Sequence, residues 1–348
     1  MDNAINHIRD TVQKNCHISD AAHAGNYTLC IYLMKMREYF RWEQRKTFSA
    51  ALPHATVGSW LREREQLWDK LEDQKFEHVS IDEQHFNPFD SEGLNKILTK
   101  YGLIYSGGLG INSKPHFFLA KLESKQEYQG YTVLVSAEEY ARDLTSPPGM
   151  TQGKTIFIRR ESLRRMLWEK LETWNWNQPD NAMGRALKFY DFKNNLDSAL
   201  DEMTENELQS MLLHEIGEIK AGELLGEPWE QLLNRVSHSK TEIMLRAVRD
   251  HLADALSTFP ALIEKNNEAS LHFYMGNLNN MRKHLYPALQ TAYENWLETE
   301  HHEDISVFHQ QNQLALPHWQ SLCEDILQLA TNKKPQKAIE DLIESRRL

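Results

Sequence analysis

The stretch "HFFLAKLESKQEYQGYTVLVSAEEYARDLTSPPGMTQGKTIFIRR", residues 116–160, differs in pattern from the chain around it. Three short segments within it, 116–123, 131–137 and 155–160, are rich in β-branched and aromatic residues and are bounded by turn residues. Such segments are typical of β-strands. We therefore predict a small antiparallel sheet, contained in about residues 101–160.

Most of the remaining sequence has the periodicity of helices, in which apolar residues recur every three or four positions. Residues 18–45 are predicted to form one long helix with Ser19 as its N-cap, and residues 56–73 a second helix. From Glu161 onwards, helical patterns follow one another to the end of the chain. These patterns predict a mainly α-helical protein.

The predicted architecture is a multi-helix, bundle-like body with a small antiparallel β insertion. Residues 1–100 and 161–348 form the helical body, and residues 101–160 form the β-rich insertion or subdomain. No sharp change of composition marks a linker. No period of ~20–50 residues recurs in the sequence, which excludes a solenoid.

The composition predicts a soluble protein with a buried core. Hydrophobic residues make up 41% of the 348 residues, which argues against general disorder. The net charge of −11 is spread along the chain, whereas nucleic-acid binding needs a concentrated basic surface. No apolar run approaches the ~20 residues that cross a bilayer, and the first residues lack the pattern of a signal peptide. We expect a cytoplasmic protein that binds neither nucleic acid nor membranes, with its oligomeric state left open.

Two motifs resemble phosphate-binding sequences in part. "GMTQGKT", residues 149–155, ends like a nucleotide-binding P-loop, but it has too few residues between its glycines. A strand is predicted after it, where a P-loop continues into a helix, so we interpret it as a turn. Residues 159–165 include four arginines, which could hold a phosphate or a carboxylate. The alternative is that they are the solvated start of an amphipathic helix.

The helix predicted over residues 204–225 contains "LLHEIGEIKAGELLG", which carries polar residues inside an apolar pattern. On a helix, His214 and Glu218 lie one turn apart at the edge of the core-facing sector, so both side chains point to one spot. Glu215 lies between that edge and the core. A buried carboxylate needs a cation, a hydrogen-bond donor or a proton. The alternative is a half-exposed helix with solvated side chains.

A second helix, within residues 246–262, contains a "DHxxD" string at the border of its apolar face. His251 and Asp254 are its candidate ligands, and they could meet the first helix in an antiparallel pair. Histidine together with carboxylates would suit a divalent ion of iron, manganese or zinc. The alternative is an ordinary surface contact between Arg246 and Asp250 with a solvated Asp254.

The first long helix adds a stripe that holds Asp20 and Tyr27, with His23 to one side. Polar groups on a buried helix must face partners or a cavity. One interpretation is that this stripe and the two later helices enclose a single polar cavity. The other is a structural hydrogen-bond network without chemistry, and the presence of Ile31 on the stripe favours it.

Together these features predict a metal-dependent enzyme with a His/carboxylate site inside a helical bundle and a small-molecule substrate. The predicted metal ligands are His214, Glu218, His251 and Asp254. Glu215 is a further ligand or a general base. Asp20, His23 and Tyr27 would lie near the metal or face the substrate. The alternative is a non-catalytic helical scaffold or regulatory protein whose β insertion binds a partner.

Overall fold

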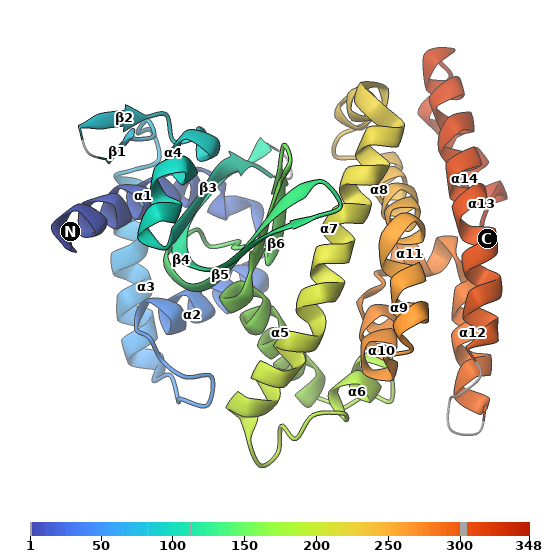
Figure 1. The fold of residues 1–348 in the computed structure, drawn as a ribbon, viewed down its shortest axis with the longest axis horizontal. Coiled ribbons are helices and arrows are strands. Elements are labelled where there is room, and N and C mark those ends of the chain that lie inside the picture. Colours follow the sequence, from blue (N-terminus) through green and yellow to red (C-terminus); the bar gives the residue numbers. More distant parts are fainter. Residues whose placement is uncertain (1, 82, 111–112, 300–304) are drawn as a thin grey trace. The chain divides into compact units, whose positions relative to one another are not determined.

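The fold is described by a computed structural model, which covers residues 2–81, 83–110, 113–299 and 305–348 (Figure 1). The chain divides into two compact units, Met1–Trp168 and Glu169–Leu348, which we call the N-terminal unit and the C-terminal unit. The predicted fold class, a helical bundle with a small antiparallel insertion, is wrong. The N-terminal unit is a substantial α/β unit built on a curled mixed sheet, together with a separate small sheet.

The main sheet has five strands in the order β3-β4-β5-β7-β6. Their bounds are Leu103–Leu109 (β3), Pro115–Tyr128 (β4), Tyr131–Arg142 (β5), Gly149–Gln152 (β6) and Thr155–Arg159 (β7). The predicted strands correspond to β4, β5 and β7. The sheet is mixed rather than antiparallel, because β5 and β7 pair in parallel. The other neighbouring strands pair antiparallel.

The sheet curls into a half-barrel. The register of β4 and β5 shifts three times between Leu119 and Ser124, and such irregularities bend a strand. A two-residue turn joins these strands, with positive φ at both Gln129 and Gly130, which matches the twist of a hairpin. The two edges approach each other closely enough for the Gln152 side-chain amide to donate to the Gly107 carbonyl oxygen at 3.0 Å.

Each face of the half-barrel has its own core. On the concave side of the half-barrel, residues of all five strands meet in one apolar cluster. Its members include Ile104, Phe118, Ala120, Leu134, Met150 and Phe157. The convex side packs against α1 (Asp2–His23) and α4 (Ser91–Leu98) through another cluster, which includes Val12, Leu94 and Phe117. This alternation follows from the period of two in a strand.

Helix α4 covers the free edge of β3. The Asn95 side chain donates to the Tyr105 carbonyl oxygen at 2.7 Å and accepts from the Tyr105 N–H at 2.8 Å. The Ser91 hydroxyl makes the same kind of pair with the backbone of Gly107. These contacts explain why the glycine-rich "SGGLG", residues 106–110, is partly a strand: its backbone is hydrogen-bonded on both sides.

The helix predicted over residues 18–45 is wrong. It is divided into α1 and α2 (Leu29–Glu43) by a 3-10 turn at Ala24–Asn26. Ser19 is not an N-cap but lies inside α1, where its hydroxyl donates to the Pro115 carbonyl oxygen. The other elements of this unit are α3 (His54–Asp69), the two strands of a small hairpin, β1 (Val79–Ile81) and β2 (Gln84–Phe86), and the start of α5 (Arg160–Asn175).

The C-terminal unit is helical in the part of it that the structure describes. Its helices are α6 (Ala182–Leu187), α7 (Leu196–Arg235), α8 (Lys240–Ala253), α9 (Phe259–Lys265), α10 (Glu268–Asn277), α11 (Asn280–Leu285), α12 (Pro287–Glu298), α13 (Ser306–Thr331) and α14 (Gln336–Ser345). A π-helical turn, Asp254–Thr258, joins α8 to α9. Helix α8 packs against α7, α11, α13 and α14, and its apolar face lies in one core with Trp229, Trp296 and Trp319.

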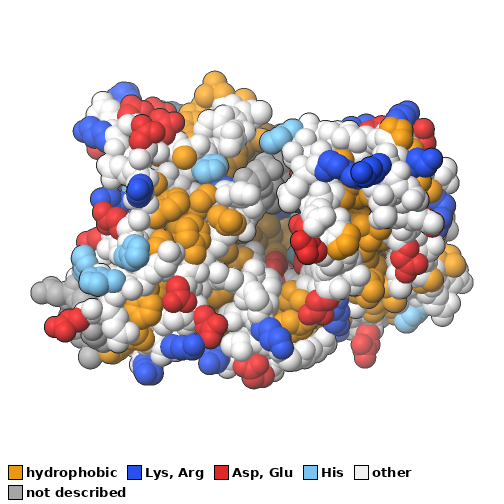
Figure 2. All heavy atoms as spheres, turned by 90° about the horizontal axis from the view of Figure 1, so that it is seen from above, with side chains coloured by type: hydrophobic (Ala, Val, Ile, Leu, Met, Phe, Trp, Pro, Cys, Tyr) orange, Lys and Arg blue, Asp and Glu red, His pale blue; other side chains and the backbone are white. Residues whose placement is uncertain are grey.

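Among the described residues, no helix is long and apolar enough to cross a membrane. Charged side chains of both signs and apolar side chains reach the surface on the face drawn in Figure 2. The exposed apolar side chains include Leu29 and Trp176, at 71% and 74% exposure. Leu29 belongs to a group on α2 with the exposed Ile31 and Leu33. Exposed apolar residues are common on protein surfaces and do not by themselves identify a partner.

Candidate functional site

The residues predicted for the site are divided between the two units. The C-terminal unit holds those predicted at the metal: His214, Glu215, Glu218, His251 and Asp254. The N-terminal unit holds those predicted to face the substrate or lie near the metal: Asp20, His23 and Tyr27.

The structure brings His214 and Asp254 together. The His214 Nδ1 on α7 lies 3.6 Å from the Asp254 Oδ1 at the start of the π-helical turn. Gly217 permits this approach, because a Cβ at that position would lie 2.4 Å from the Ala253 carbonyl oxygen. The Asp254 side chain is buried, whereas 39% of the His214 side chain is exposed. π-Helical turns occur often at functional sites.

Asp254 is also an ion-pair partner of Arg282, which reaches it from α11. Burial alone would raise the pKa of Asp254, but the Arg282 guanidinium and the nearby His214 imidazole hold it well below its usual range. Burial alone would lower the pKa of His214, but its interaction with the Asp254 carboxylate raises it to about 9. At neutral pH the pair is therefore an imidazolium and a carboxylate.

The other predicted ligands of this unit have different partners. Glu218 forms an ion pair with Arg249 at 2.7 Å. His251 points into the core, where its Nε2 lies 3.0 Å from the Arg282 carbonyl oxygen and its ring stacks on Trp319. Burial and the nearby Arg282 charge lower the pKa of His251 to about 3, so the ring is neutral. Glu215 lies half-buried beside His214 in the sequence.

These contacts bear on the predicted metal site. In the described parts of the chain, no group of three or more His, Cys, Asp or Glu side chains is arranged to hold a metal ion. The carboxylates of Glu218 and Asp254 each contact an arginine. The metal site stays a prediction, with His214 and Asp254 as the pair that supports it.

In the N-terminal unit, Asp20 and Tyr27 belong to one buried network. The fully buried Asp20 accepts from the Lys114 ammonium at 3.0 Å and from the Leu144 N–H at 2.8 Å. Lys114 also donates to the Thr145 hydroxyl, which lies 2.8 Å from the Tyr27 hydroxyl. His23 makes a local contact instead, with its Nδ1 2.9 Å from the Ser19 carbonyl oxygen.

This network continues through Asp143, which the sequence did not indicate. The His116 Nδ1 lies 3.0 Å from the Asp143 carboxylate, and both side chains are buried. Burial would raise the pKa of Asp143, but the hydrogen bond from His116 and the Lys114 charge hold it well below its usual range. Burial has the larger effect on Asp20 and raises its pKa to about 6, against the charge of Lys114.

The same interior holds a third buried carboxylate, Glu139 of β5. The Arg159 guanidinium donates to it at 2.8 Å, and the hydroxyls of Ser162 and Ser146 donate at 2.6 and 3.3 Å. Arg159 lies in the arginine-rich segment of residues 159–165, for which carboxylate binding was one of two interpretations. Arg159 is not solvated: it and its partner Glu139 are fully buried. Binding of a phosphate or carboxylate ligand by this segment stays a prediction.

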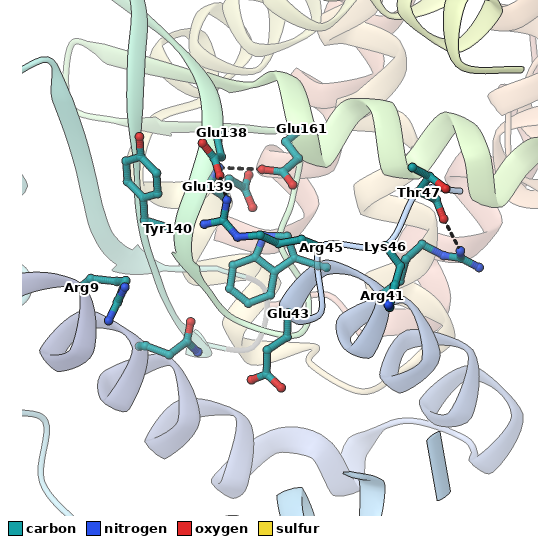
Figure 3. Close-up of a pocket in the computed structure, with 12 residues that line it drawn as sticks. Arg9, Arg41, Glu43, Arg45, Lys46, Thr47, Glu138, Glu139, Tyr140 and Glu161 are labelled. Carbon is teal, nitrogen blue, oxygen red and sulfur yellow. Dashed lines mark hydrogen bonds and ion pairs between the residues drawn. The ribbon is translucent and has the colours of Figure 1, made fainter. Parts of the chain in front are cut away.

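A pocket of about 500 Å³ opens beside Glu139 (Figure 3). Its lining is dominated by charged groups of both signs: Arg9, Arg41, Arg45, Lys46, Glu43, Glu138, Glu139 and Glu161. Gln13, Trp42, Thr47 and Tyr140 complete the described lining. Small-molecule sites have volumes of this order, although they usually have more apolar walls. This pocket is therefore suited to a polar ligand.

Glu161 is the unusual residue of this pocket. Its carboxylate accepts a hydrogen bond from the Glu139 N–H at 2.6 Å, which Figure 3 marks. Burial, and then the negative charge of Glu139, raise the pKa of Glu161 to about 7. Two neighbouring carboxyl groups thus have different environments: one is bound by an arginine, and the other changes protonation near neutral pH. Such pairs divide the roles of acid and base in many enzymes.

The fold and these sites define a two-domain protein, with an α/β half-barrel unit followed by a helical unit. Residues 7–159 match the N-terminal domain, and residues 164–346 the C-terminal domain, of the Family of unknown function (DUF6866). The chain belongs to this family. No curated protein and no solved structure matches it.

Proposed function

We propose that this protein is an enzyme that performs general acid–base chemistry on a small anionic substrate in the pocket of the N-terminal unit. The observation that supports the proposal is the environment of Glu161, a half-buried carboxyl group beside Glu139 with its pKa raised to about 7. Titratable groups with such perturbed pKa values inside a cavity are candidates for catalysis. A general acid or base is most effective when its pKa is near the working pH.

Glu161 rather than Glu139 is the group that transfers the proton. Both carboxylate oxygens of Glu139 already accept hydrogen bonds, one of them from the Arg159 guanidinium. Glu139 therefore acts as a fixed negative charge that keeps the pKa of Glu161 high. When Glu161 is protonated it can donate to a substrate oxygen or nitrogen, and when it is ionised it can accept a proton.

The exposed basic side chains of the pocket are the groups that would bind an anionic substrate. Arg45 and Lys46 project from the exposed segment that follows α2, and Arg9 projects from α1 (Figure 3). The ion pairs of Arg45 with Glu138, and of Arg9 with Asp10, are exposed. Exposed pairs contribute little free energy, so these guanidinium groups can turn to a substrate carboxylate or phosphate.

The test is a panel of small carboxylates and phosphate esters, screened for binding by thermal shift and for conversion by mass spectrometry. We expect at least one compound to stabilise both the wild-type protein and Glu161→Gln, but to be converted about 10²–10⁴ times more slowly by the variant. Glu138→Gln, in the same pocket but exposed, is the matched control and should keep the activity. Equal conversion by the wild type and Glu161→Gln would contradict the proposal.

A second measurement needs no substrate. The side-chain carboxyl carbon of Glu161 should titrate in a ¹³C NMR experiment near pH 7. This signal should be absent from the spectrum of Glu161→Gln and present in that of Glu138→Gln. A Glu161 signal that titrates in the ordinary range of glutamate would remove the basis of the proposal.

The metal-dependent enzyme predicted from the sequence is the second candidate, and the approach of His214 to Asp254 supports it. Its test is elemental analysis of protein purified without a metal-binding tag. About one iron, manganese or zinc per chain, lost in His214→Ala, would establish it. If neither metal nor turnover is found, the non-catalytic scaffold, with the half-barrel as its partner-binding part, becomes the better explanation. The cytoplasmic location stays a prediction.

A further inference from the structure

A second cavity of the N-terminal unit lies between α4 and the two hairpins formed by β4–β5 and β6–β7. Its volume is about 770 Å³, within the range of cavities that bind small molecules. None of the described residues lines both this cavity and the pocket of Glu161. The proposed function therefore makes no use of it.

One row of paired residues crosses this cavity. Lys125 of β4 is the register partner of Leu134 of β5, and Leu134 is the register partner of Phe157 of β7. Directly paired residues of neighbouring strands point to the same face of a sheet. The row therefore leads from the exposed Lys125 to Leu134 and Phe157. These two side chains form an apolar floor on the concave face of the half-barrel.

A second cation lines the same cavity. Lys154 lies in the turn between β6 and β7, lines the same cavity and is exposed. The described residues show no ion pair for Lys125 or Lys154, whereas Lys96 of the same lining pairs with Glu92 at 2.8 Å. Two lysines beside an apolar floor match a ligand that has an anionic group and a hydrocarbon part.

Gln152 supplies a third feature of the lining. Its Nε2 donates to the Gly107 carbonyl oxygen, which fixes the orientation of the amide. Its Oε1 is buried and has no hydrogen-bond partner among the described residues. Buried acceptors are normally satisfied, so this oxygen indicates a donor that is supplied by the ligand.

We propose that this cavity binds a small amphipathic carboxylic acid that also carries an amide or hydroxyl donor. Its hydrocarbon part packs on Leu134 and Phe157, its carboxylate lies near Lys125 and Lys154, and its donor contacts the Gln152 Oε1. This is a binding site distinct from the site of proton transfer, and it does not depend on the proposed reaction.

The probe is N-octanoylglycine, which combines an alkyl chain, an amide N–H and a carboxylate. Binding is measured by isothermal titration calorimetry. We expect at least about tenfold weaker binding for its methyl ester, which has no charge, and for Lys125→Gln/Lys154→Gln. Lys70→Gln/Lys121→Gln, with two exposed lysines outside the cavity, is the matched control and should bind like the wild type.

The role of Gln152 is tested with octanoate, which lacks the amide. The wild type should bind N-octanoylglycine more tightly than octanoate, and Gln152→Met should lose most of this preference. The proposal is overturned if N-octanoylglycine does not bind, or if it binds the Lys125→Gln/Lys154→Gln variant as tightly as the wild type. Loss of binding in Glu161→Gln, with the lysine variant unaffected, would place the ligand in the other pocket and would also overturn it.

Discussion

The two units each contain a buried arginine–carboxylate pair, Arg159 with Glu139 and Arg282 with Asp254, but they differ in the group next to that pair. In the N-terminal unit the neighbour is another carboxyl group, Glu161, and burial together with the negative charge of Glu139 raises its pKa to about 7. In the C-terminal unit the neighbour is His214, and the negative charge of Asp254 raises its pKa to about 9.

The same electrostatic influence therefore has opposite consequences at neutral pH. Glu161 is close to half-protonated and can exchange a proton, whereas His214 keeps its proton and remains a cation. In this protein, a carboxyl group beside a buried negative charge titrates near pH 7, whereas an imidazole beside one keeps its proton at neutral pH. It is also why we place the chemistry in the N-terminal unit.

The largest expected change in the free energy of unfolding concerns the two buried arginines, Arg159 and Arg282. Arg159→Met leaves Glu139 buried without a cation and should lower the free energy of unfolding by about 3–5 kcal/mol. Arg282→Met should cost less, because the imidazolium of His214 still faces Asp254. Urea unfolding at pH 7 measures both values, and Arg159→Met/Glu139→Gln should recover part of the loss. Equal losses for the two arginine variants would contradict the comparison.

The next largest expected change in stability concerns the close packing of α7 against the π-helical turn. Gly217→Ala places a methyl group against the Ala253 carbonyl oxygen and should destabilise the C-terminal unit by about 1–3 kcal/mol. Gly222→Ala is the matched control on the same helix. No atom lies within 4 Å of the Cβ position at Gly222, so the change should stabilise the helix by up to about 1 kcal/mol. Thermal unfolding distinguishes the two signs.

The pH dependence of the N-terminal unit should follow Glu161. Its pKa is raised from 4.5 to about 7, so the folded state binds more protons than the unfolded state between these values. Stability from this group is fully present below about pH 4.5 and is lost as the pH rises through 7. We expect a loss of about 1–2 kcal/mol after allowance for partial exposure. In Glu161→Gln, unfolding curves between pH 4.5 and 7 should lack this slope.

The C-terminal unit should show a smaller effect at higher pH. The pKa of His214 is raised from 6.5 to about 9, so its contribution is fully present below about pH 6.5 and is lost as the pH rises through 9. Because 39% of the side chain is exposed, solvent screening reduces the expected loss to about 1 kcal/mol. His214→Gln should remove this dependence, and a slope that persists in the variant would show that another group is responsible.

Local sequence pattern predicted part of the fold. The strands at 116–123, 131–137 and 155–160 were predictable because strand-forming residues and flanking turns are local signals. Strand β3 was missed because the glycines of "SGGLG" are typical of a loop, and its backbone is held by Ser91 and Asn95 from a different element. The predicted helix over residues 18–45 failed because periodicity alone did not show that the chain breaks near Gly25.

Local sequence patterns were limited in the same way for the candidate sites, because they did not show which other elements supply the contacts. Helical spacing identified His214 and Asp254, because each lies at the edge of an apolar face. It did not show that Arg282 and Arg249 contact the nearby carboxylates, since those arginines come from other helices. Glu161 was missed entirely, because its pKa depends on Glu139, which the pairing of β5 with β7 brings next to α5.

The cover that α4 gives to β3 has a consequence for how this protein behaves at high concentration. An uncovered strand edge is a template for pairing with another chain and thus for aggregation. Two side chains of α4, Ser91 and Asn95, already form hydrogen bonds with the backbone of Tyr105 and Gly107 at this edge. We therefore expect removal of α4 to open this edge to pairing with other chains, although α4 has no part in the proposed proton transfer.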